Sequence, residues 1–156
     1  MKTVFMNSPL GITKIEGDEN GIAVISVLSE GTVSEEIPLE LQEAVNQLRD
    51  YFDAKRTDFT FKLNPKGTDF QQKVWQELLN IPFGKTMSYL DLAKKLGDPK
   101  VIRAAASANG KNPLWIVVPC HRVIGTDGSL TGYAGGLWRK KWLLEHENPT
   151  NQQSLF

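Results

Sequence analysis

The sequence predicts an α+β protein, with a small N-terminal antiparallel sheet and one helix followed by a mostly helical C-terminal domain that contains a helix-turn-helix. Two observations carry this prediction. Residues 11–28 hold two runs rich in Ile, Val and Thr around a turn, whereas apolar residues recur at helical spacing beyond residue 66. With 156 residues, 40% hydrophobic and 23% charged, the chain can bury one sizeable core or two small ones.

The N-terminal part predicts a hairpin covered by a helix. Residues 11–15 and 21–28 read as two strands joined by a polar turn that contains glycine. Apolar residues recur at helical spacing from Leu41 to Phe52 and predict a helix there, and Pro38 suits its first turn. The alternation in residues 59–63 predicts one more strand of the sheet.

Charge changes sign where Asn, Pro and Gly interrupt the chain at residues 64–67. Residues 1–65 hold 6 basic against 11 acidic side chains, and residues 66–147 hold 12 against 7, although the whole chain has a formal net charge of zero. We place the domain boundary between residues 65 and 66. The basic second part suits phosphate contacts, but chance clustering of solvated charges explains the split equally well.

Three helices follow the boundary. Thr68 is a plausible N-cap for a helix over residues 70–79. A second helix runs from Ser88 to Leu96 and is ended by Gly97. A third covers residues 100–108, and the short turn between the last two predicts a helix-turn-helix.

The third helix is rich in alanine, which is unusual for a helix that reads base edges in the major groove. Small side chains would instead let its backbone approach a minor groove, with Arg103 as the one long group able to reach inward. Tight packing inside the protein is the alternative for such an alanine run.

The chain's single cysteine lies in an unusual setting. Cys120 directly follows Pro119 and precedes His121 and Arg122, two basic side chains that we expect to stabilise a thiolate. Since neighbouring side chains diverge, a water would bridge Cys120 to His121. A buried inert cysteine and a thiol hydrolase are the alternatives.

Several function classes are not expected. One cysteine cannot form an internal disulfide, and with two histidines it falls short of a zinc site. We find no signal peptide, membrane-spanning run or glycine-rich nucleotide loop. We therefore expect no metal, no cofactor and no membrane partner, and a cytoplasmic location, or a nuclear one in a eukaryote.

These motifs closely resemble the O6-alkylguanine-DNA alkyltransferase family, also called methylated-DNA–protein-cysteine methyltransferases. The core of the resemblance is residues 119–123, Pro-Cys-His-Arg-Val, and it extends over residues 68–147. The other matching positions are Tyr89, Arg103, Asn112, Pro113, Gly132, Tyr133, Ala134, Gly135, Gly136, Lys140, Trp142, Leu143, Leu144 and Glu147. The N-terminal sheet matches in layout more than in residues.

The resemblance implies a role for each catalytic position. Cys120 would accept the alkyl group, His121 would act as base through water, and Glu147 would orient the imidazole. Asn112 would hold the active-site turn, and Tyr89 would donate a proton to the departing guanine.

The resemblance also implies a set of DNA and substrate contacts. Arg103 would fill the space left by a flipped nucleotide, Tyr133 and the glycines after it would close over the base, and Lys140 would lie near the alkylated oxygen. The family often has a hydroxyl residue where this chain has Ala134, which affects the affinity for particular bases or inhibitors. The implied set is Arg103, Ala104, Ala105, Ser107, Pro119, Arg122, Tyr133, Ala134, Gly135 and Lys140.

The implied function is DNA repair by direct reversal of O6-alkylguanine, and of O4-alkylthymine, in double-stranded DNA. The enzyme would be a methylated-DNA-[protein]-cysteine S-methyltransferase that acts once, without cofactor, as a monomer. Residues 1–65 would form a ribonuclease-H-like supporting domain, residues 66–147 the DNA-binding and alkyl-transfer domain, and residues 148–156 a flexible tail. Two alternatives remain: a cysteine hydrolase using Cys120, His121 and Glu147, and a non-enzymatic binder of alkylated DNA, which typically lacks the acceptor cysteine.

Overall fold

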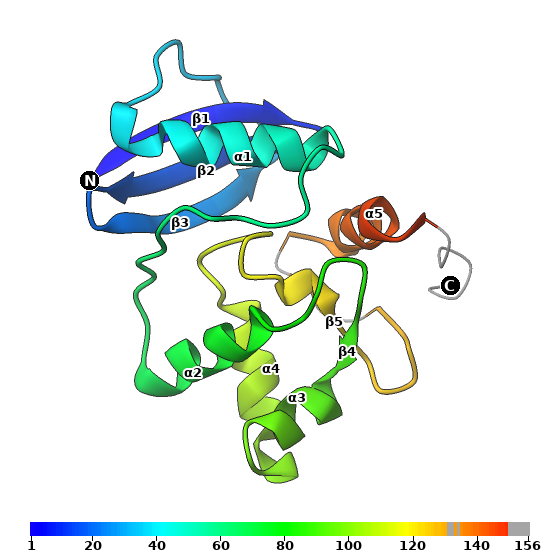
Figure 1. The fold of residues 1–156 in the computed structure, drawn as a ribbon. Coiled ribbons are helices and arrows are strands. Elements are labelled where there is room, and N and C mark those ends of the chain that lie inside the picture. Colours follow the sequence, from blue (N-terminus) through cyan, green and yellow to red (C-terminus); the bar gives the residue numbers. More distant parts are fainter. Residues whose placement is uncertain (131–132, 134, 150–156) are drawn as a thin grey trace. The chain divides into compact units, whose positions relative to one another are not determined.

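The structure is a computed structural model that describes residues 1–130, 133 and 135–149. Contacts divide the chain into two compact units, one made of residues 1–66 and 113–117 and the other of residues 67–112 and the chain from 118 onward. The first unit carries a three-stranded antiparallel sheet, and the second is mainly helical (Figure 1). The predicted α+β class is confirmed.

The sheet of the first unit has the order β1-β2-β3, with β1 at Lys2–Ser8, β2 at Gly11–Asp18 and β3 at Gly21–Leu28. Its register aligns Val4 with Ile15 and Ile15 with Ile25, so three buried apolar side chains share one face. The predicted hairpin of β2 and β3 is therefore correct. The first strand was not predicted, although its buried Val4 and Met6 alternate as in a half-buried strand.

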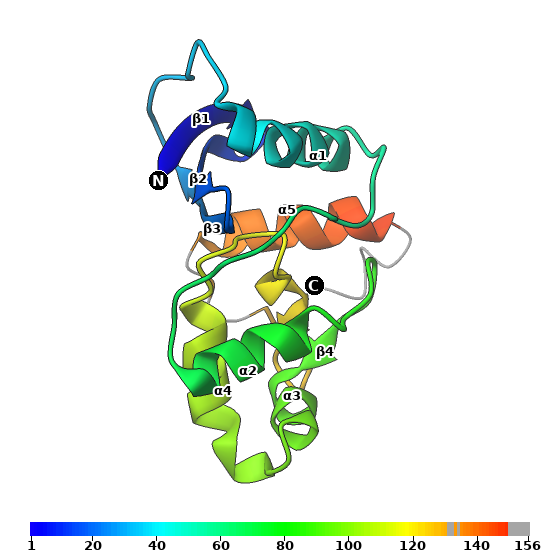
Figure 2. The ribbon, with the colours of Figure 1, turned by 60° about the vertical axis from the view of Figure 1, so that its left-hand side comes forward.

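Helix α1 (Gln42–Phe52) lies against the sheet, after a single 3-10 turn, η1 (Leu39–Leu41) (Figures 1 and 2). Its buried face includes Val45, Leu48 and Tyr51, which recur at the spacing that predicted a helix here. The helix prediction is confirmed, and its apolar face supplies the core of the unit together with the sheet.

The predicted strand over residues 59–63 is wrong. Only Leu63 forms a bridge, with Ile22 of β3. The side chain of Gln47 instead accepts a hydrogen bond from the Thr60 amide and donates one to the Thr60 hydroxyl, each at 2.8 Å. The Phe59 ring packs 5.5 Å from the ring of Tyr51. Side-chain contacts with α1 thus hold the middle of this segment, and the Ile22 amide, which donates to the Lys62 carbonyl at 2.9 Å, ties its end to β3. Alternation alone could not reveal the contacts with α1.

Residues 113–117 leave the helical part of the chain and pair with β3 of the first unit. The Ile25 amide donates to the carbonyl of Pro113 at 2.8 Å, and the Trp115 amide donates to the carbonyl of Ile25 at 3.0 Å. Ile116 follows with a φ of 72°, in a three-residue turn closed by the Val117 amide on the Trp115 carbonyl. The edge of β3 is therefore covered by the segment that precedes Cys120.

The second unit begins with α2 (Asp69–Leu78). Thr68 and Gln71 form a complete capping box at its start, which confirms Thr68 as the N-cap. The indole of Trp75 donates to the carbonyl of Ala108 at 2.9 Å, which joins α2 to the end of a later helix.

The next two helices are those predicted to form the helix-turn-helix. Helix α3 (Tyr89–Lys95) is capped by Ser88, and Gly97 ends it with a φ of 104°. A 3-10 turn, η2 (Pro99–Val101), capped by Asp98, leads into α4 (Ile102–Gly110). The three predicted helices are present, but α4 extends through Asn109 and Gly110, where the sequence predicted its end.

Two short strands, β4 (Met87–Ser88) and β5 (Val123–Ile124), pair in parallel, and α5 (Leu137–Glu147) closes the described part of the unit. None of the helices in residues 1–130, 133 and 135–149 is long and apolar enough to cross a membrane.

The core of the first unit yields a stability prediction. Replacing Leu48, which has no exposed surface, by alanine should lower the free energy of unfolding by about 2–5 kcal/mol, because it leaves a cavity beneath α1. The same substitution at Leu39, 84% exposed, should change it by less than about 0.5 kcal/mol. Urea unfolding of both variants checks this, and equal losses would contradict the described packing.

Candidate active site around Cys120

Two tight turns place Cys120. Pro119 has a φ of −81° and a ψ of 64°, the geometry of an inverse γ-turn, and the Cys120 amide donates to the carbonyl of Val118 at 2.8 Å across it. The proline ring restricts φ to this region. Residues Cys120–Arg122 then form a 3-10 turn, η3. Pro119 is buried, and only 7% of Cys120 is exposed.

Two asparagine side chains near the end of α4 hold the backbone of this turn. The amide of Asn112 donates to the carbonyl of Val118 at 2.7 Å. The amide of Asn109 donates to the carbonyl of Cys120 at 3.4 Å. The two carbonyls on either side of Pro119 are therefore both bound from the same stretch of chain, which fixes the backbone that carries the thiol.

Glu147 of α5 joins His121 and Arg122 in a buried network. Its Oε2 lies 2.8 Å from Nε2 of His121. The Arg122 guanidinium binds both carboxylate oxygens, with Nε 2.7 Å from Oε1 and Nη2 3.0 Å from Oε2. Its Nη1 donates to the carbonyl of Ile81 at 2.7 Å, and its Cζ lies 5.8 Å from the centre of the Phe83 ring.

This network sets the charges of its members. Burial alone would raise the pKa of Glu147, but the charges and hydrogen bonds of His121 and Arg122 hold that pKa well below its ordinary value. Burial lowers the pKa of His121, and Arg122 and Lys140 add to this effect while Glu147 opposes it. A neutral imidazole facing a carboxylate carries its proton on the facing nitrogen, here Nε2. The Nδ1 lone pair is then available, and Nδ1 is buried without a hydrogen-bond partner among the described residues.

The thiol of Cys120 is not the stabilised thiolate that the sequence predicted. Burial raises the pKa of Cys120 above its ordinary value. Hydrogen bonds from Asn112 and Tyr133 and the charge of Lys140 oppose this rise without cancelling it. Arg122 does not contribute as expected, because Glu147 binds its guanidinium. The resting thiol is protonated at neutral pH and needs a base.

Lys140 of α5 is a buried cation beside the thiol. It has no exposed surface, and burial lowers its pKa to about 8, although the charge of Cys120 acts to raise it. Its Nζ lies 5.9 Å from the centre of the Tyr89 ring. The site thus brings together the thiol and imidazole of η3, the ammonium group of Lys140 in α5, and the phenols of Tyr89 in α3 and of Tyr133.

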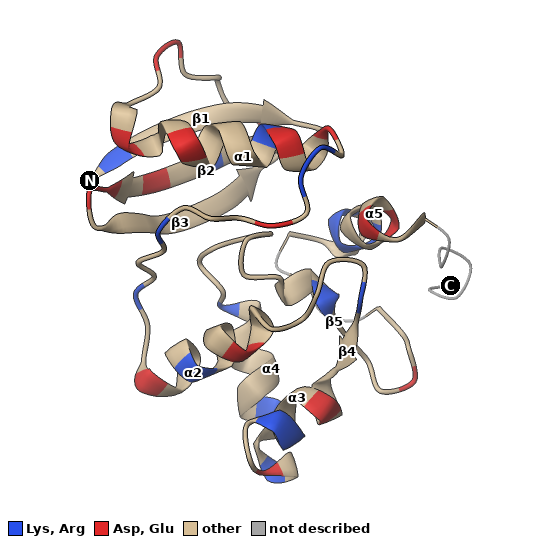
Figure 3. Ribbon diagram, in the orientation of Figure 1, with Lys and Arg blue, Asp and Glu red and all other residues tan. Residues whose placement is uncertain are grey.

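The outer face of α4 carries the predicted DNA-contacting residues. Arg103, Ala104 and Ser107 are exposed. Ala105 is fully buried, so its side chain does not belong to this face. Near α4, the ribbon carries lysines at the end of α3 and in η2, with Asp91 and Asp98 close to them in the sequence (Figure 3).

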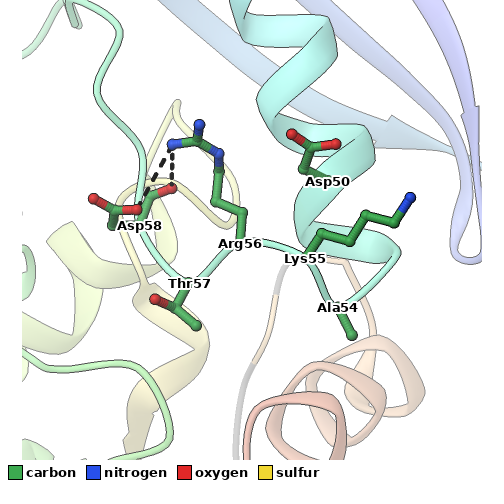
Figure 4. Close-up of a pocket in the computed structure, with 6 residues that line it drawn as sticks. All are labelled: Asp50, Ala54, Lys55, Arg56, Thr57 and Asp58. Atoms are coloured by element: carbon green, nitrogen blue, oxygen red, sulfur yellow. Dashed lines mark hydrogen bonds and ion pairs between the residues drawn. The ribbon is translucent and has the colours of Figure 1, made fainter.

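Other parts of the described chain offer weaker candidates. Residues 1–130, 133 and 135–149 contain no group of three His, Cys, Asp or Glu side chains able to hold a metal ion. A surface pocket at the end of α1 is lined by Asp50, Ala54, Lys55, Arg56, Thr57 and Asp58 (Figure 4). Its acids and bases balance, with Arg56 3.6 Å from Asp58, and it shares no residue with the Cys120 site.

Two family models together match nearly the whole chain. Residues 1–65 match the ribonuclease-like domain of 6-O-methylguanine DNA methyltransferase, and residues 69–149 match its DNA binding domain. The chain belongs to the 6-O-methylguanine DNA methyltransferase family. The resemblance drawn from the residues around Cys120 is confirmed.

Curated members of this family are similar over most of their length. The methylated-DNA–protein-cysteine methyltransferase of Methanosarcina barkeri is 44% identical over 149 residues, 91% of this chain and 94% of the relative. That of Methanosarcina acetivorans is 42% identical over 154 residues, 94% and 98% of the two chains.

Solved structures of the 6-O-methylguanine DNA methyltransferase family agree in fold. The crystal structure of Mycobacterium tuberculosis O6-methylguanine methyltransferase has a TM-score of 0.84 at 41% identity and covers 94% of this chain and 92% of its own. Mycobacterium tuberculosis OGT in complex with DNA has a TM-score of 0.85 at 42% identity, with 97% of both chains covered.

Most residues predicted from the family pattern gather in one place, but two do not fit their predicted positions. Arg122 was expected to contact DNA, yet all of its observed hydrogen bonds are internal, to Glu147 and Ile81. Ala105 faces the core. The carbonyl of Gly135 accepts a hydrogen bond from Arg139 at 2.8 Å. Gly132, Ala134 and residues 150–156 lie outside the described residues.

Family motifs did not reveal two further contacts. Asn109 was taken only as a helix stop, but a polar side chain next to an alanine run could have suggested a buried hydrogen bond. The carbonyl of Ile81, which binds Arg122, carries no sequence signal because any residue supplies a backbone carbonyl.

The buried network predicts how Glu147 contributes to stability. Replacing Glu147 by glutamine leaves the Arg122 charge buried without a counterion, so the free energy of unfolding at pH 7 should fall by about 3–5 kcal/mol. The folded pKa of Glu147 lies below its unfolded value of about 4.3, so the carboxylate's contribution is complete above that pH and is lost as pH falls through the folded pKa. The gap between wild type and variant should therefore narrow below about pH 4.

Urea unfolding between pH 3 and pH 7 measures that gap. The control is Glu36→Gln, at an exposed loop position, which should match wild type throughout. A gap independent of pH would show that the carboxylate charge is not what stabilises the fold.

Proposed function

We propose that this chain repairs O6-alkylguanine in double-stranded DNA by transferring the alkyl group irreversibly to Cys120. One observation carries the proposal: the chain has a single cysteine, and that cysteine is buried among Asn112, Tyr133 and Lys140, next to the His121–Glu147 pair. The similar Methanosarcina proteins are named for transfer to a protein cysteine. In this chain only Cys120 can serve as that acceptor.

The proposed chemistry starts from a protonated thiol. His121 takes the thiol proton through a water at Nδ1, while Glu147 accepts the Nε2 proton in a hydrogen bond and balances the imidazolium that forms. The thiolate attacks the alkyl carbon, the carbon–O6 bond breaks, and its electron pair leaves with guanine. Tyr89 donates a proton to the departing base, and the nearby Lys140 charge favours both the thiolate and an ionised phenol.

The product explains why the protein acts once. Alkyl transfer leaves a thioether on Cys120, and water does not open a thioether under these conditions. The displacement balances with the thiol, the base and the alkylated nucleotide alone, so the proposed step requires no cofactor.

The proposed DNA surface is a helix-turn-helix made of α3, η2 and α4. Small exposed side chains at Ala104 and Ser107 allow α4 to lie close to sugar and phosphate in a minor groove. Arg103, exposed and long, fills the stack after the damaged nucleotide is flipped out. Residues 133–136 close over the base, and buried Pro119 shapes the pocket wall.

The remaining assignments follow from the same proposal. Residues 1–65 form the supporting ribonuclease-H-like domain, and residues 66–147 bind DNA and accept the alkyl group. The protein acts as a cytoplasmic monomer, and O4-alkylthymine is a further substrate.

Peptide mass spectrometry tests the acceptor, substrate and stoichiometry together. After incubation with an O6-methylguanine duplex, the peptide containing Cys120 should gain one methyl group per protein molecule. The duplex should lose one lesion for each methyl gained, because each thiol reacts once.

The matched control is Cys120→Ala, which should still bind the duplex and repair none of it. Lesion loss in that variant, or an unmodified Cys120 in folded, reduced wild type, would overturn the proposal. Repeated turnover of an ester or amide substrate would instead favour the cysteine hydrolase.

The role of Arg103 gives a separate prediction. Arg103→Ala should slow transfer from duplex DNA by about tenfold or more, because each 1.4 kcal/mol of lost support for the flipped state is tenfold in rate. Transfer from a free O6-alkylguanine base, which needs no extrusion, should be unchanged.

Single-turnover rates with both substrates measure this difference. Lys100→Ala is the control: it removes an exposed neighbouring charge and should weaken duplex binding in a salt-dependent manner without widening the gap between the two substrates. Equal slowing of both substrates by Arg103→Ala would rule out a role in flipping.

A further inference from the structure

Asn109 is a buried polar side chain to which the mechanism above gives no role. It lies in the last turn of α4 and is 2% exposed. The Nδ2 of Asn109 donates to the Cys120 carbonyl at 3.4 Å. The backbone carbonyl of Asn109 accepts from the backbone amide of Asn112, also at 3.4 Å. Asn109 therefore binds the backbone of Cys120 with its side chain and the backbone of Asn112 with its main chain.

The other end of this amide has no partner in the described residues. Oδ1 of Asn109 is buried without a hydrogen bond there, and so is Nδ1 of His121. Both atoms are acceptors, because an amide oxygen cannot donate and Nδ1 is the unprotonated nitrogen of the ring. Neither can satisfy the other, and buried acceptors in native proteins are normally paired with a protein donor or a water.

The two residues that carry these acceptors meet at the Cys120–His121 peptide. Asn109 binds the carbonyl of Cys120, and His121 is the next residue along the chain. A water has two hydrogens to donate, one for each acceptor, and lone pairs left to accept from a thiol. No single side chain offers this combination.

We propose that Asn109 is a positioning residue of the transfer reaction, whose Nδ2 holds the Cys120 carbonyl and whose Oδ1, with Nδ1 of His121, holds the water that carries the thiol proton. The inference rests on the proposed function and deepens it. The water accepts the proton from Sγ and gives one of its own to Nδ1, so it is regenerated as the sulfur–carbon bond forms. The carbon–O6 electron pair leaves with guanine.

The same residue connects the thiol to the DNA-facing helix. Ala108, its neighbour, is fixed by the Trp75 indole at 2.9 Å, and Arg103 lies in the same helix. Asn109 is therefore the residue through which α4, the helix that carries Arg103, reaches the Cys120 carbonyl.

The test separates proton transfer from folding and binding. Asn109→Leu keeps a similar volume and removes both amide functions. At saturating O6-methylguanine duplex, its single-turnover rate constant should fall at least about tenfold, with the dissociation constant for DNA within about twofold of wild type. Asn80→Leu, the same change at an exposed position of the second unit, should leave both unchanged.

A pH profile identifies the role of the oxygen. Asn109→Asp keeps an acceptor but adds a negative charge beside the thiol, so the pH at which transfer reaches half its maximum should rise relative to wild type. An unchanged profile together with parallel losses of binding and rate would mean that Asn109 is merely structural, and the proposal would fail.

A high-resolution crystal structure of the wild-type chain gives an answer even where Asn109→Leu does not fold. One ordered water within hydrogen-bond distance of both Oδ1 of Asn109 and Nδ1 of His121 is expected. Finding either atom paired with a protein donor instead overturns the proposal. If Cys120 is methylated at full rate in Asn109→Leu, this inference fails while the proposed function stands.

Discussion

The buried ion pair between Glu147 and Arg122 is the interaction on which the rest of the site depends. An isolated carboxylate at this depth would be protonated or would unfold the surrounding structure, because moving it out of water costs several kcal/mol. Arg122 offsets that cost with two hydrogen bonds to the carboxylate. Glu147 therefore stays ionised, orients His121, and leaves Nδ1 of the imidazole as the acceptor. Arg122, which the motif suggested as a DNA contact, instead keeps Glu147 ionised.

Burial has opposite consequences for the nucleophile and its neighbours. It raises the pKa of Cys120 and lowers those of His121 and Lys140, so burial shifts each group toward its uncharged form, although Lys140, with a pKa of about 8, still carries its charge at neutral pH. The resting site therefore holds a neutral thiol and a neutral imidazole. In the proposed reaction, a proton moves from sulfur to imidazole and creates two opposite charges that stabilise each other. A protonated resting thiol also limits loss of the chain's single cysteine to oxidants and other electrophiles.

Local signals predicted the fold where the chain itself makes the contacts. The Thr68–Gln71 capping box and the Ser88 cap are formed by residues three apart, and the β2–β3 hairpin by neighbours across one turn. Residues 59–63 were mistaken for a strand because only their end pairs with β3, whereas Thr60 is bound by the side chain of a distant glutamine, Gln47. The family motif predicted Cys120, His121 and Glu147 as site residues, and the structure brings His121 and Glu147 within hydrogen-bond distance. The motif did not reveal the protonation of the thiol, which depends on burial by many residues at once.

A strained turn ends the short segment of the first unit that precedes Cys120 in the sequence. Ile116 is β-branched, buried and held at a φ of 72°, a conformation that costs about 1–3 kcal/mol for such a residue. It persists because the chain just before it is fixed by two hydrogen bonds to Ile25 of β3. Three residues later, Pro119 turns the chain again, and the side-chain amides of Asn109 and Asn112 bind the backbone on either side of it. The two hydrogen bonds to Ile25 thus position the strained turn within the first unit, and the two asparagine amides position the backbone of Cys120 within the second.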